Sequence, residues 1–311
     1  MPVLGKPGRV RKPRALRVGD KVRVVAPAGA WDDTRMRQGR TLLESWGLRV
    51  DGPPQTSSYR YMSAADSDRA ADLKDAFMDE DSAAIVCARG GFGSARTGAE
   101  LAPGFFEHVP PKLFVGFSDV SILLMRLVEE AGLVCFHGPM VAADLPSVGG
   151  PAIERFRRML FGEPDWWDGK AAGVWREGRA SGTLVGGCLS VLVTTLGTPY
   201  ELQTTGRVLF VEDVAEPSYR IDRMLTQLGH AGKLESLAGL VFGSMTDCDD
   251  GQGSDRLAEI VMDVVGQRSY PILFGLDAGH CSSNAPLPFG CEVSVDSSSS
   301  SVELLESPLA G

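Results

Sequence analysis

The sequence predicts an α/β protein in two parts: an N-terminal domain built on a mainly parallel, doubly wound sheet, and a smaller β-rich C-terminal domain. In the first half of the 311 residues, apolar runs of strand length alternate with runs of helical periodicity. Such alternation implies right-handed crossovers and a parallel sheet. From Arg179 onward, short β-prone runs are separated by many glycines. With 43% hydrophobic residues, each part can bury a core.

The elements of the first half follow one another regularly. Strands are expected at residues 22–26, 48–50, 83–88 and 112–115, and helices at 35–45, 64–77 and 120–128. Asp66 and Asp68 suit the first turn of the second helix, where carboxylates meet the positive end of the helix dipole. Loops that bind ligands collect at the carboxyl ends of parallel strands. The segments 89–91 and 116–118 both follow such ends, so they are expected to share one rim.

The predicted organisation has four parts. These are a disordered basic tail at 1–15, the N-terminal α/β domain at 16–145, a linker at 146–180 and the C-terminal domain at 181–311. The linker holds an expected helix at 152–161 and the pair Trp166-Trp167, which could either stack on a planar ligand such as adenine or anchor the linker against the fold. The second half is expected to contain strands at 208–211, 272–276, 292–295 and 302–305, and a helix at 221–228.

Charge and cysteine usage exclude several classes of function. A net charge of −9 argues against nucleic acid as a partner, because binding phosphates requires a basic surface. The basic N-terminal segment contains no acid and several prolines, which favours a solvated tail over a binding arm. No run approaches the roughly 18 apolar residues of a membrane span, and no apolar export segment is apparent. Six scattered cysteines without metal-site spacing favour the reducing cytoplasm and no metal.

Ser118 lies in the most informative turn of the chain. It follows an apolar strand and precedes a helix-like run, so its hydroxyl would stand beside the unpaired N–H groups at the start of that helix. An acyl-transfer enzyme places its nucleophile there, because the oxyanion then forms against donors already in position. A helix N-cap gives the same pattern, since serine and aspartate are both preferred caps. The turn alone leaves both interpretations open.

A general base and an orienting acid are available elsewhere in the chain. Of the four histidines, His280 is the best placed, because it follows an expected strand and opens a loop of small polar residues. The strand at 208–211 ends in Glu212 and Asp213, and a carboxylate at such a position can orient an imidazole. Adjacent residues of a strand point to opposite faces, so only one of these two acids can reach the ring.

The glycine-rich segment after Arg89 could supply backbone donors. Gly90 and Gly91 lack a Cβ and allow an N–H group to approach a substrate carbonyl. The oxyanion donors are therefore assigned to the N–H groups of Gly91 and Asp119, with a plain tight turn as the alternative. The spacing matches neither G-x-G-x-x-G nor a Walker loop, which argues against a phosphate site.

Several of these segments together resemble the LD-carboxypeptidases, a family of serine peptidases that includes relatives inactivating microcin C. The resemblance covers about residues 14 to 305 and rests on separate blocks in the same order. The blocks are 16–22, 25–28, 89–96, 116–119, 136–139, 182–187, 197–199, 212–213 and the histidine block formed by 279–280, Asn284, Leu287, Pro288 and Gly290. One departure is Cys188, where the family usually has asparagine, and we expect it to affect substrate positioning or loop support.

The resemblance implies a catalytic triad of Ser118 as nucleophile, His280 as general base and Glu212 as orienting acid, at the interface of the two domains. Substrate contacts are expected from Arg89, Gly90, Trp166 and Trp167. The implied activity is removal of a terminal D-amino acid from cell-wall tetrapeptides during peptidoglycan recycling, by a homodimer without a cofactor.

Two alternatives stay open at the level of sequence. The same triad could hydrolyse aminoacyl or peptidyl adenylates, as in microcin immunity, with the Trp166-Trp167 pair holding the adenine base of the substrate. A non-catalytic module could also bind a ligand in the same place, although such a module has no need for all three triad residues.

Overall fold

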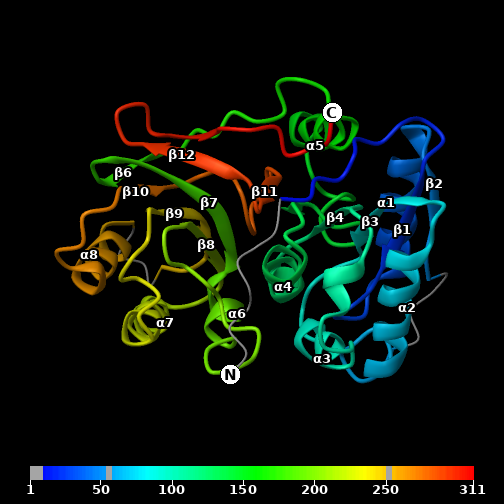
Figure 1. Cartoon of the computed structure of the whole chain (residues 1–311), viewed down its shortest axis with the longest axis horizontal. Helices are drawn as coiled ribbons and strands as arrows, with labels where there is room; N and C mark the ends of the chain where they lie inside the picture. Colours follow the sequence, from blue (N-terminus) through cyan, green and yellow to red (C-terminus); the bar gives the residue numbers. More distant parts are fainter. Residues whose placement is uncertain (1–9, 54–57, 250–253) are drawn as a thin grey trace. The chain divides into compact units, whose positions relative to one another are not determined.

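The computed structural model describes residues 10–53, 58–249 and 254–311 (Figure 1). The chain forms two compact units. Unit 1 comprises residues up to Trp167 together with Ala285–Gly290 and Pro308–Gly311, and unit 2 comprises Asp168–Asn284 and Cys291–Ser307. The chain therefore passes from one unit to the other more than once, and the segment Pro308–Gly311 lies in unit 1.

Unit 1 is built on a six-stranded sheet. Its strands are β1 (Lys21–Val25), β2 (Arg49–Asp51), β3 (Ser82–Cys87), β4 (Leu113–Gly116), β5 (Cys135–His137) and β11 (Leu287–Phe289), in the spatial order β11-β5-β4-β3-β1-β2. All neighbours are parallel except β11, which pairs antiparallel with β5. All six residues of β3 are buried, as expected for a central parallel strand covered on both faces. Pro288 is tolerated in β11 because that strand lies at the edge.

The helices of unit 1 cover both faces of this sheet. They are α1 (Asp33–Ser45), α2 (Asp66–Met78), α3 (Ser94–Ala99), α4 (Ser121–Ala131) and α5 (Gly150–Phe161), with short 3-10 turns η1 (Phe105–His108) and η2 (Ser118–Val120). The strand order reverses between β1 and β3, so right-handed crossovers put α1 on one face and the helices from α2 to α4 on the other. The loops after β1 and β3 meet at this switch point, where such sheets bind ligands.

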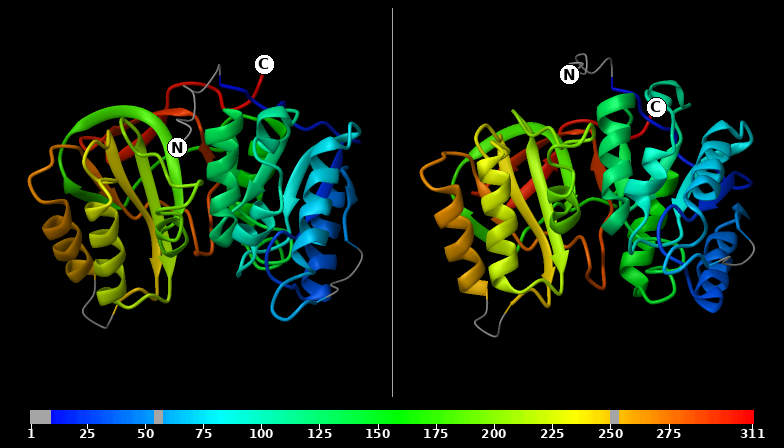
Figure 2. Two further views of the ribbon diagram at one scale, coloured as in Figure 1. Left: turned by 60° about the horizontal axis from the view of Figure 1, so that its bottom comes forward. Right: turned by 90° about the horizontal axis from the view of Figure 1, so that it is seen from below.

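Unit 2 is built on a seven-stranded sheet in the order β13-β12-β7-β8-β9-β10-β6. Its strands are β6 (Gly173–Arg176), β7 (Arg179–Cys188), β8 (Val208–Val214), β9 (Gly239–Thr246), β10 (Ile272–Phe274), β12 (Glu292–Asp296) and β13 (Ser301–Leu304). The neighbours from β7 to β10 are parallel, and the outer strands add antiparallel pairs. The helices α6 (Leu189–Val193), α7 (Ser218–His230) and α8 (Ser254–Val265) connect the parallel strands, and α7 and α8 lie side by side (Figure 2).

The predicted fold class is confirmed: unit 1 has the doubly wound parallel sheet, and unit 2 is the smaller, β-rich part. The expected elements coincide with observed ones to within a few residues, and Asp66 and Asp68 do occupy the first turn of α2. Two boundaries differ from the prediction. Helix α5, placed in the linker, buries Phe156 and Met159 in unit 1, whereas β6, also placed there, pairs with β10 of unit 2.

The expected disordered tail is wrong for its last residues. Arg11 forms backbone hydrogen bonds with Gly132 and Val134, and Arg14 forms an ion pair with Asp20 at 2.6 Å. Prolines and basic residues suggested a solvated chain, but the backbone polar groups here find partners in unit 1. Residues 1–9 of the predicted tail lie outside the described residues.

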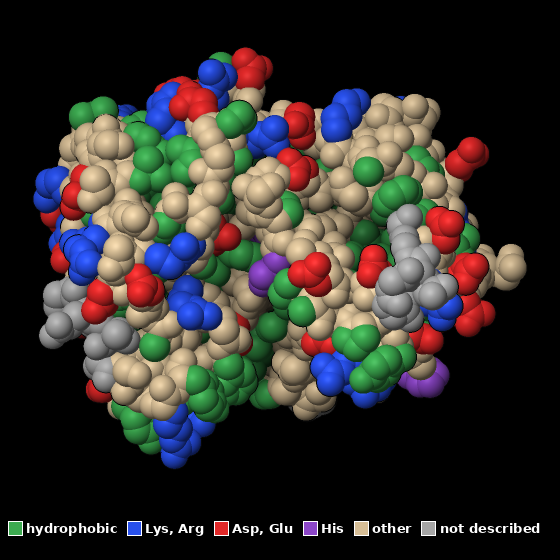
Figure 3. All heavy atoms as spheres, turned by 180° about the vertical axis from the view of Figure 1, so that it is seen from behind, with side chains coloured by type: hydrophobic (Ala, Val, Ile, Leu, Met, Phe, Trp, Pro, Cys, Tyr) green, Lys and Arg blue, Asp and Glu red, His purple; other side chains and the backbone are tan. Residues whose placement is uncertain are grey.

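Positive and negative side chains are mixed on the surface shown in Figure 3. On the face seen in Figure 3, Lys and Arg side chains alternate with Asp and Glu and form no continuous basic area. Among the described residues, no helix combines the length and apolar character that a membrane span needs.

Substitution of Gly186 should test the close contact between β7 and β8. Gly186 has a φ of 140°, and a Cβ there would lie 1.8 Å from the Phe210 carbonyl oxygen. We expect Gly186→Ala to lower the free energy of unfolding by on the order of 3 kcal/mol, through strain and displacement of the strand. Chemical denaturation followed by circular dichroism measures this change.

Gly229→Ala in α7 is the matched control, because its new Cβ would meet its nearest neighbour, Val264 Cγ1, at 3.8 Å. It should be neutral or stabilising by up to about 1 kcal/mol. Equal free energies of unfolding for the two variants would show that the close contact between Gly186 and Phe210 does not require glycine.

Candidate active site

Ser118 lies in a strained turn of unit 1, immediately after β4 and Phe117. Its φ is 60°, in the left-handed region that costs a non-glycine residue roughly 1–2 kcal/mol. The N-cap positions of η2 and α4 are Phe117 and Val120, and neither makes a side-chain cap hydrogen bond. The geometry therefore favours a nucleophile elbow, in which a strained strand-to-helix turn presents the serine hydroxyl, over the N-cap interpretation.

The Arg89-Gly90-Gly91 loop packs directly against this turn. A Cβ on Gly90 would lie 2.9 Å from Ser118 Cβ, 3.0 Å from Ser118 Oγ and 3.3 Å from the Asp119 nitrogen. Only glycine allows this approach, so the two loops do share one rim. Gly91, with a φ of 104°, follows at once. The backbone nitrogens assigned as oxyanion donors thus belong to two adjoining segments.

A third loop holds the glycine loop in place. The Gly29 N–H donates to the Gly90 carbonyl at 3.0 Å, and Arg89 Nη1 donates to the Ala30 carbonyl at 3.0 Å. The guanidinium of Arg89 therefore supports this loop, while its side chain remains largely exposed. Its expected substrate contact stays a prediction.

Asp119 has a structural contact of its own. Its buried carboxylate accepts the N–H of Ser94, the first residue of α3, at 2.8 Å. Burial raises the pKa of Asp119, and the hydrogen bonds from Ser94 oppose that rise. The side chain thus joins the turn at Ser118 to α3, and the role of the Asp119 backbone N–H as an oxyanion donor stays a prediction.

In unit 2, His280 and Glu212 form a close pair. His280 Nδ1 lies 2.7 Å from Glu212 Oε2, and the same oxygen accepts the backbone N–H of His280 at 3.0 Å. The carboxylate is fully buried, whereas the imidazole is 21% exposed. With Nδ1 directed at the acid, Nε2 is the nitrogen on the far side of the ring. That is the arrangement of a general base oriented by a carboxylate.

Glycine and asparagine shape the histidine loop around the carboxylate. Gly279 has a φ of 107°, and a Cβ on it would lie 2.5 Å from Glu212 Oε2. The Gly279 N–H donates to the side chain of the fully buried Asn284 at 3.1 Å. A larger residue at position 279 would displace the loop from Glu212, so glycine at this position is required for the contact between the loop and the carboxylate.

Asp213 points away from the histidine. Its Oδ2 accepts the Ser190 N–H at 2.7 Å, at the start of α6, and Oδ1 accepts the Val214 N–H at 2.9 Å. Burial is the main cause that raises the pKa of Asp213. Strand alternation thus separates the two neighbouring acids as the sequence indicated.

Cys188 belongs to the Asp213 cluster. Its buried Sγ lies 3.5 Å from Asp213 Oδ1 and 3.4 Å from Ser190 Oγ. Burial, followed by the charges of Glu212 and Asp213, raises the pKa of this thiol and keeps it protonated. These contacts agree with a role in loop support, while an effect on substrate positioning stays a prediction.

Trp166 and Trp167 differ in their surroundings. Trp166 is 8% exposed and packs edge-on against Phe136 at a centroid distance of 6.4 Å. Trp167 is partly exposed and meets Trp166 edge-on at 5.7 Å. The contacts favour the anchoring role for Trp166, because its ring is occupied by the core of unit 1.

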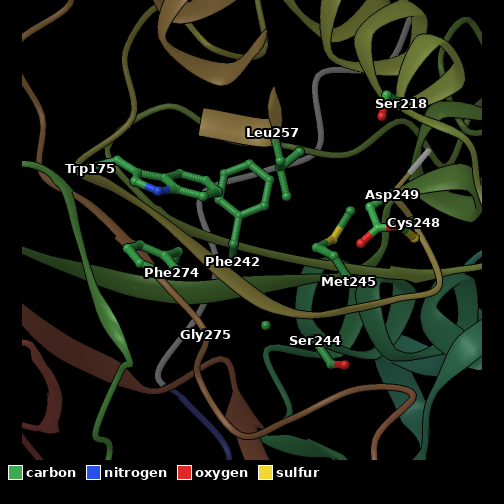
Figure 4. A pocket seen from close by; sticks show the side chains of 11 residues that line it. Trp175, Ser218, Phe242, Ser244, Met245, Cys248, Asp249, Leu257, Phe274 and Gly275 are labelled. Atoms are coloured by element: carbon green, nitrogen blue, oxygen red, sulfur yellow. The ribbon is translucent and has the colours of Figure 1, made fainter. Parts of the chain in front are cut away.

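A cavity of about 270 Å³ lies in unit 2 beside the carboxyl ends of β9 and β10. Trp175, Phe242 and Phe274 gather on one side of it, and Ser244 and Met245 lie near its other side (Figure 4). The rings of Trp175 and Phe274 stack at 4.7 Å, so the aromatic side is itself closely packed. No sequence pattern predicted this cavity, because the residues that line it come from separate elements.

Comparison with known proteins identifies both units. Residues 22–138 match the family model of the LD-carboxypeptidase N-terminal domain, and residues 181–295 match that of the C-terminal domain. The chain is 36% identical over 293 residues to a protein named probable murein peptide carboxypeptidase from Bacillus subtilis (strain 168), covering 92% of this chain and 91% of that protein. It is 30% identical to the murein tetrapeptide carboxypeptidase of Pseudomonas aeruginosa, covering 88% and 92%.

Solved structures show the same fold. The microcin immunity protein MccF in complex with glutamyl sulfamoyl guanosine superimposes with a TM-score of 0.85 at 20% identity, covering 96% of this chain and 99% of that one. A muramoyltetrapeptide carboxypeptidase from Oxalobacter formigenes gives 0.79 at 26% identity, covering 91% and 97%. The matches to both family models and to the curated relatives establish that this chain belongs to the LD-carboxypeptidase family.

Proposed function

We propose that this protein is a serine carboxypeptidase that cleaves an L,D-peptide bond and releases a terminal D-amino acid, D-alanine, from cell-wall tetrapeptides during peptidoglycan recycling. The names of the bacterial relatives support the substrate class. The single observation that carries the mechanism is the hydrogen bond between Glu212 and His280. A buried carboxylate that orients a partly exposed imidazole is the arrangement required for general-base activation of a serine.

In the proposed mechanism, Ser118 Oγ attacks the scissile carbonyl carbon as His280 Nε2 takes the hydroxyl proton. Glu212 stabilises the imidazolium that forms and fixes its tautomer. The N–H groups of Gly91 and Asp119 stabilise the oxyanion. The carbon–nitrogen bond then breaks, and the imidazolium returns the proton to the leaving amine. Water, deprotonated by His280, hydrolyses the acyl-enzyme and releases Ser118. The mechanism requires Ser118 of unit 1 to meet His280 of unit 2.

The cellular setting follows from the same proposal. All six cysteines are free thiols, as in proteins of a reducing compartment, which supports action in the cytoplasm. The homodimer implied by the family resemblance stays a prediction.

Loss of the nucleophile should abolish activity. We expect Ser118→Ala to lower turnover of the tetrapeptide to the tripeptide by on the order of 10⁶-fold, as in other serine–histidine triads. Product formation followed by mass spectrometry measures this loss, and circular dichroism confirms folding. Ser45→Ala is the matched control, because Ser45 is exposed on α1 and its hydroxyl bonds only the Leu42 carbonyl.

A fluorophosphonate probe separates the enzyme from a binding module. Labelling of Ser118 in the wild type, absent in Ser118→Ala, is expected. Full turnover in Ser118→Ala would exclude the mechanism, and a folded wild type that resists labelling would favour the non-catalytic module.

The two neighbouring acids should have different effects. Glu212→Gln is expected to lower kcat by about 10⁴-fold, because the amide no longer holds the imidazole in one tautomer; that magnitude comes from the serine-protease triad. Asp213→Asn should leave kcat within a few-fold of wild type and act on stability instead, because its carboxylate accepts backbone N–H groups. Steady-state kinetics and thermal unfolding of both variants test this. A greater loss of kcat in Asp213→Asn would reverse the assignment.

Hydrolysis of aminoacyl adenylates is the second candidate, supported by the likeness to MccF structures that contain aminoacyl sulfamoyl nucleosides. Because Trp166 is buried, the Trp166-Trp167 pair is poorly placed to hold the adenine ring of such a substrate between two aromatic side chains. We expect a higher kcat/KM for a muropeptide than for an aminoacyl sulfamoyl adenylate when the two are assayed side by side. A higher value for the nucleotide would favour the immunity-type function.

A further inference from the structure

Two hydroxyl groups on β9 lie next to the histidine loop. Thr246 Oγ1 donates to the backbone carbonyl of His280 at 2.6 Å, and Ser244 Oγ lies 2.5 Å from Thr246 Oγ1. Thr246 is the last residue of β9, and both side chains are partly buried. No sequence pattern pointed to Ser244 or Thr246, and the proposed mechanism assigns them no role.

These hydroxyls continue the pairing between β9 and the loop that follows β10. The Leu276 N–H donates to the Phe242 carbonyl at 3.1 Å, and the Ser244 N–H donates to the Ala278 carbonyl at 2.8 Å. Two residues further along each segment, the contact is made by the Thr246 hydroxyl instead of a backbone N–H. The loop is therefore bonded to β9 at regular intervals up to the catalytic histidine.

Thr246 also contacts the chain on the other side of β9. The Thr246 carbonyl accepts the Ala215 N–H at 2.8 Å, beyond the end of β8. The same residue thus ties the end of the strand that carries Glu212 to the loop that carries His280.

The direction of the hydrogen bonds follows from counting protons. A threonine hydroxyl has one proton, and Thr246 uses it on the His280 carbonyl. Ser244 must then donate to Thr246 Oγ1. Donation into Thr246 polarises its O–H and strengthens the bond to His280. Ser244 also lines the cavity of unit 2, where Figure 4 shows its side chain.

Both backbone polar groups of His280 are therefore hydrogen-bonded. Its N–H is bonded to Glu212, and its carbonyl is bonded to Thr246. We propose that Thr246, supported by Ser244, is a positioning residue that fixes the His280 backbone so that the imidazole keeps its short contact with Glu212. This inference rests on the proposed role of His280 as general base.

Replacement of the hydroxyl by a methyl group tests the proposal. Thr246→Val keeps the shape of the side chain and removes the donor. We expect kcat to fall by about 10- to 100-fold, the order of loss that a displacement near 1 Å produces, with KM changed less than about twofold. Thr246→Ser retains the hydroxyl and should restore kcat to within about threefold of wild type. Ser244→Ala should lower kcat by several-fold.

Thr194→Val is the matched control. Thr194 is exposed on the chain after α6, and its hydroxyl bonds the Val191 carbonyl at 2.7 Å within the same unit. This variant should keep wild-type kcat, which separates the loss of one particular hydroxyl bond from the general effect of a threonine-to-valine change.

A measurement independent of turnover completes the test. The proton on His280 Nδ1, bonded to Glu212, should give a downfield NMR resonance in the wild type, Thr246→Ser and Thr194→Val, and a broadened or missing one in Thr246→Val. Wild-type kcat and an unchanged resonance in Thr246→Val would overturn the proposal, and so would a change confined to KM. If Thr246→Val fails to fold, Ser244→Ala decides by the same two readouts.

The outcomes distinguish this inference from the proposed function. Tetrapeptide turnover unaffected by Ser118→Ala would contradict the serine mechanism, yet the Nδ1 resonance would still report whether Thr246 positions His280. A normal effect of Ser118→Ala with wild-type behaviour of Thr246→Val would contradict only the positioning role.

Discussion

The buried carboxylate of Glu212 is the constraint on which the histidine loop of unit 2 depends. A charged group without exposure is costly unless hydrogen bonds replace its water. His280 supplies two donors to one oxygen, from its ring and from its backbone. That requirement explains the left-handed Gly279, which alone leaves space for the carboxylate, and the buried Asn284 that fixes the Gly279 N–H. The need of the buried Glu212 carboxylate for hydrogen-bond donors thus explains the conformation of the loop and the orientation of the imidazole.

In unit 1, backbone geometry fixes the position of Ser118. Its sheet reverses order between β1 and β3, so the loops after these strands lie at the switch point, beside the turn that follows β4. Gly90 closely approaches both Gly29 and Ser118 there because the glycines have no side chains. A strained serine is tolerated because the surrounding loops over-determine its position. Under the proposed mechanism, unit 2 would supply the imidazole, and unit 1 the serine hydroxyl and backbone N–H groups.

Local patterns were sufficient for the features that depend on neighbours in sequence. Strand alternation separated Glu212 from Asp213 before any contact was known, and helical periodicity located α1, α2 and α4. Features set by distant segments were missed. The pairing of residues 10–14 with unit 1 depends on partners more than a hundred residues away, such as Leu133 and Ala310. The bond from Thr246 to His280 depends on the register between β9 and a loop 34 residues later, which no periodicity reveals.

The interleaving of the two units has a consequence for biosynthesis. Strand β11, which covers the exposed edge of β5, and the segment Pro308–Gly311 belong to unit 1 but are translated after the core of unit 2. An uncovered strand edge is a template for unwanted pairing. The growing chain must therefore carry an incomplete sheet of unit 1 until β11 has been translated. Unit 1 is begun before unit 2 but completed after most of it, and cutting the gene at the boundary near residue 167 would yield an N-terminal fragment without its edge strand.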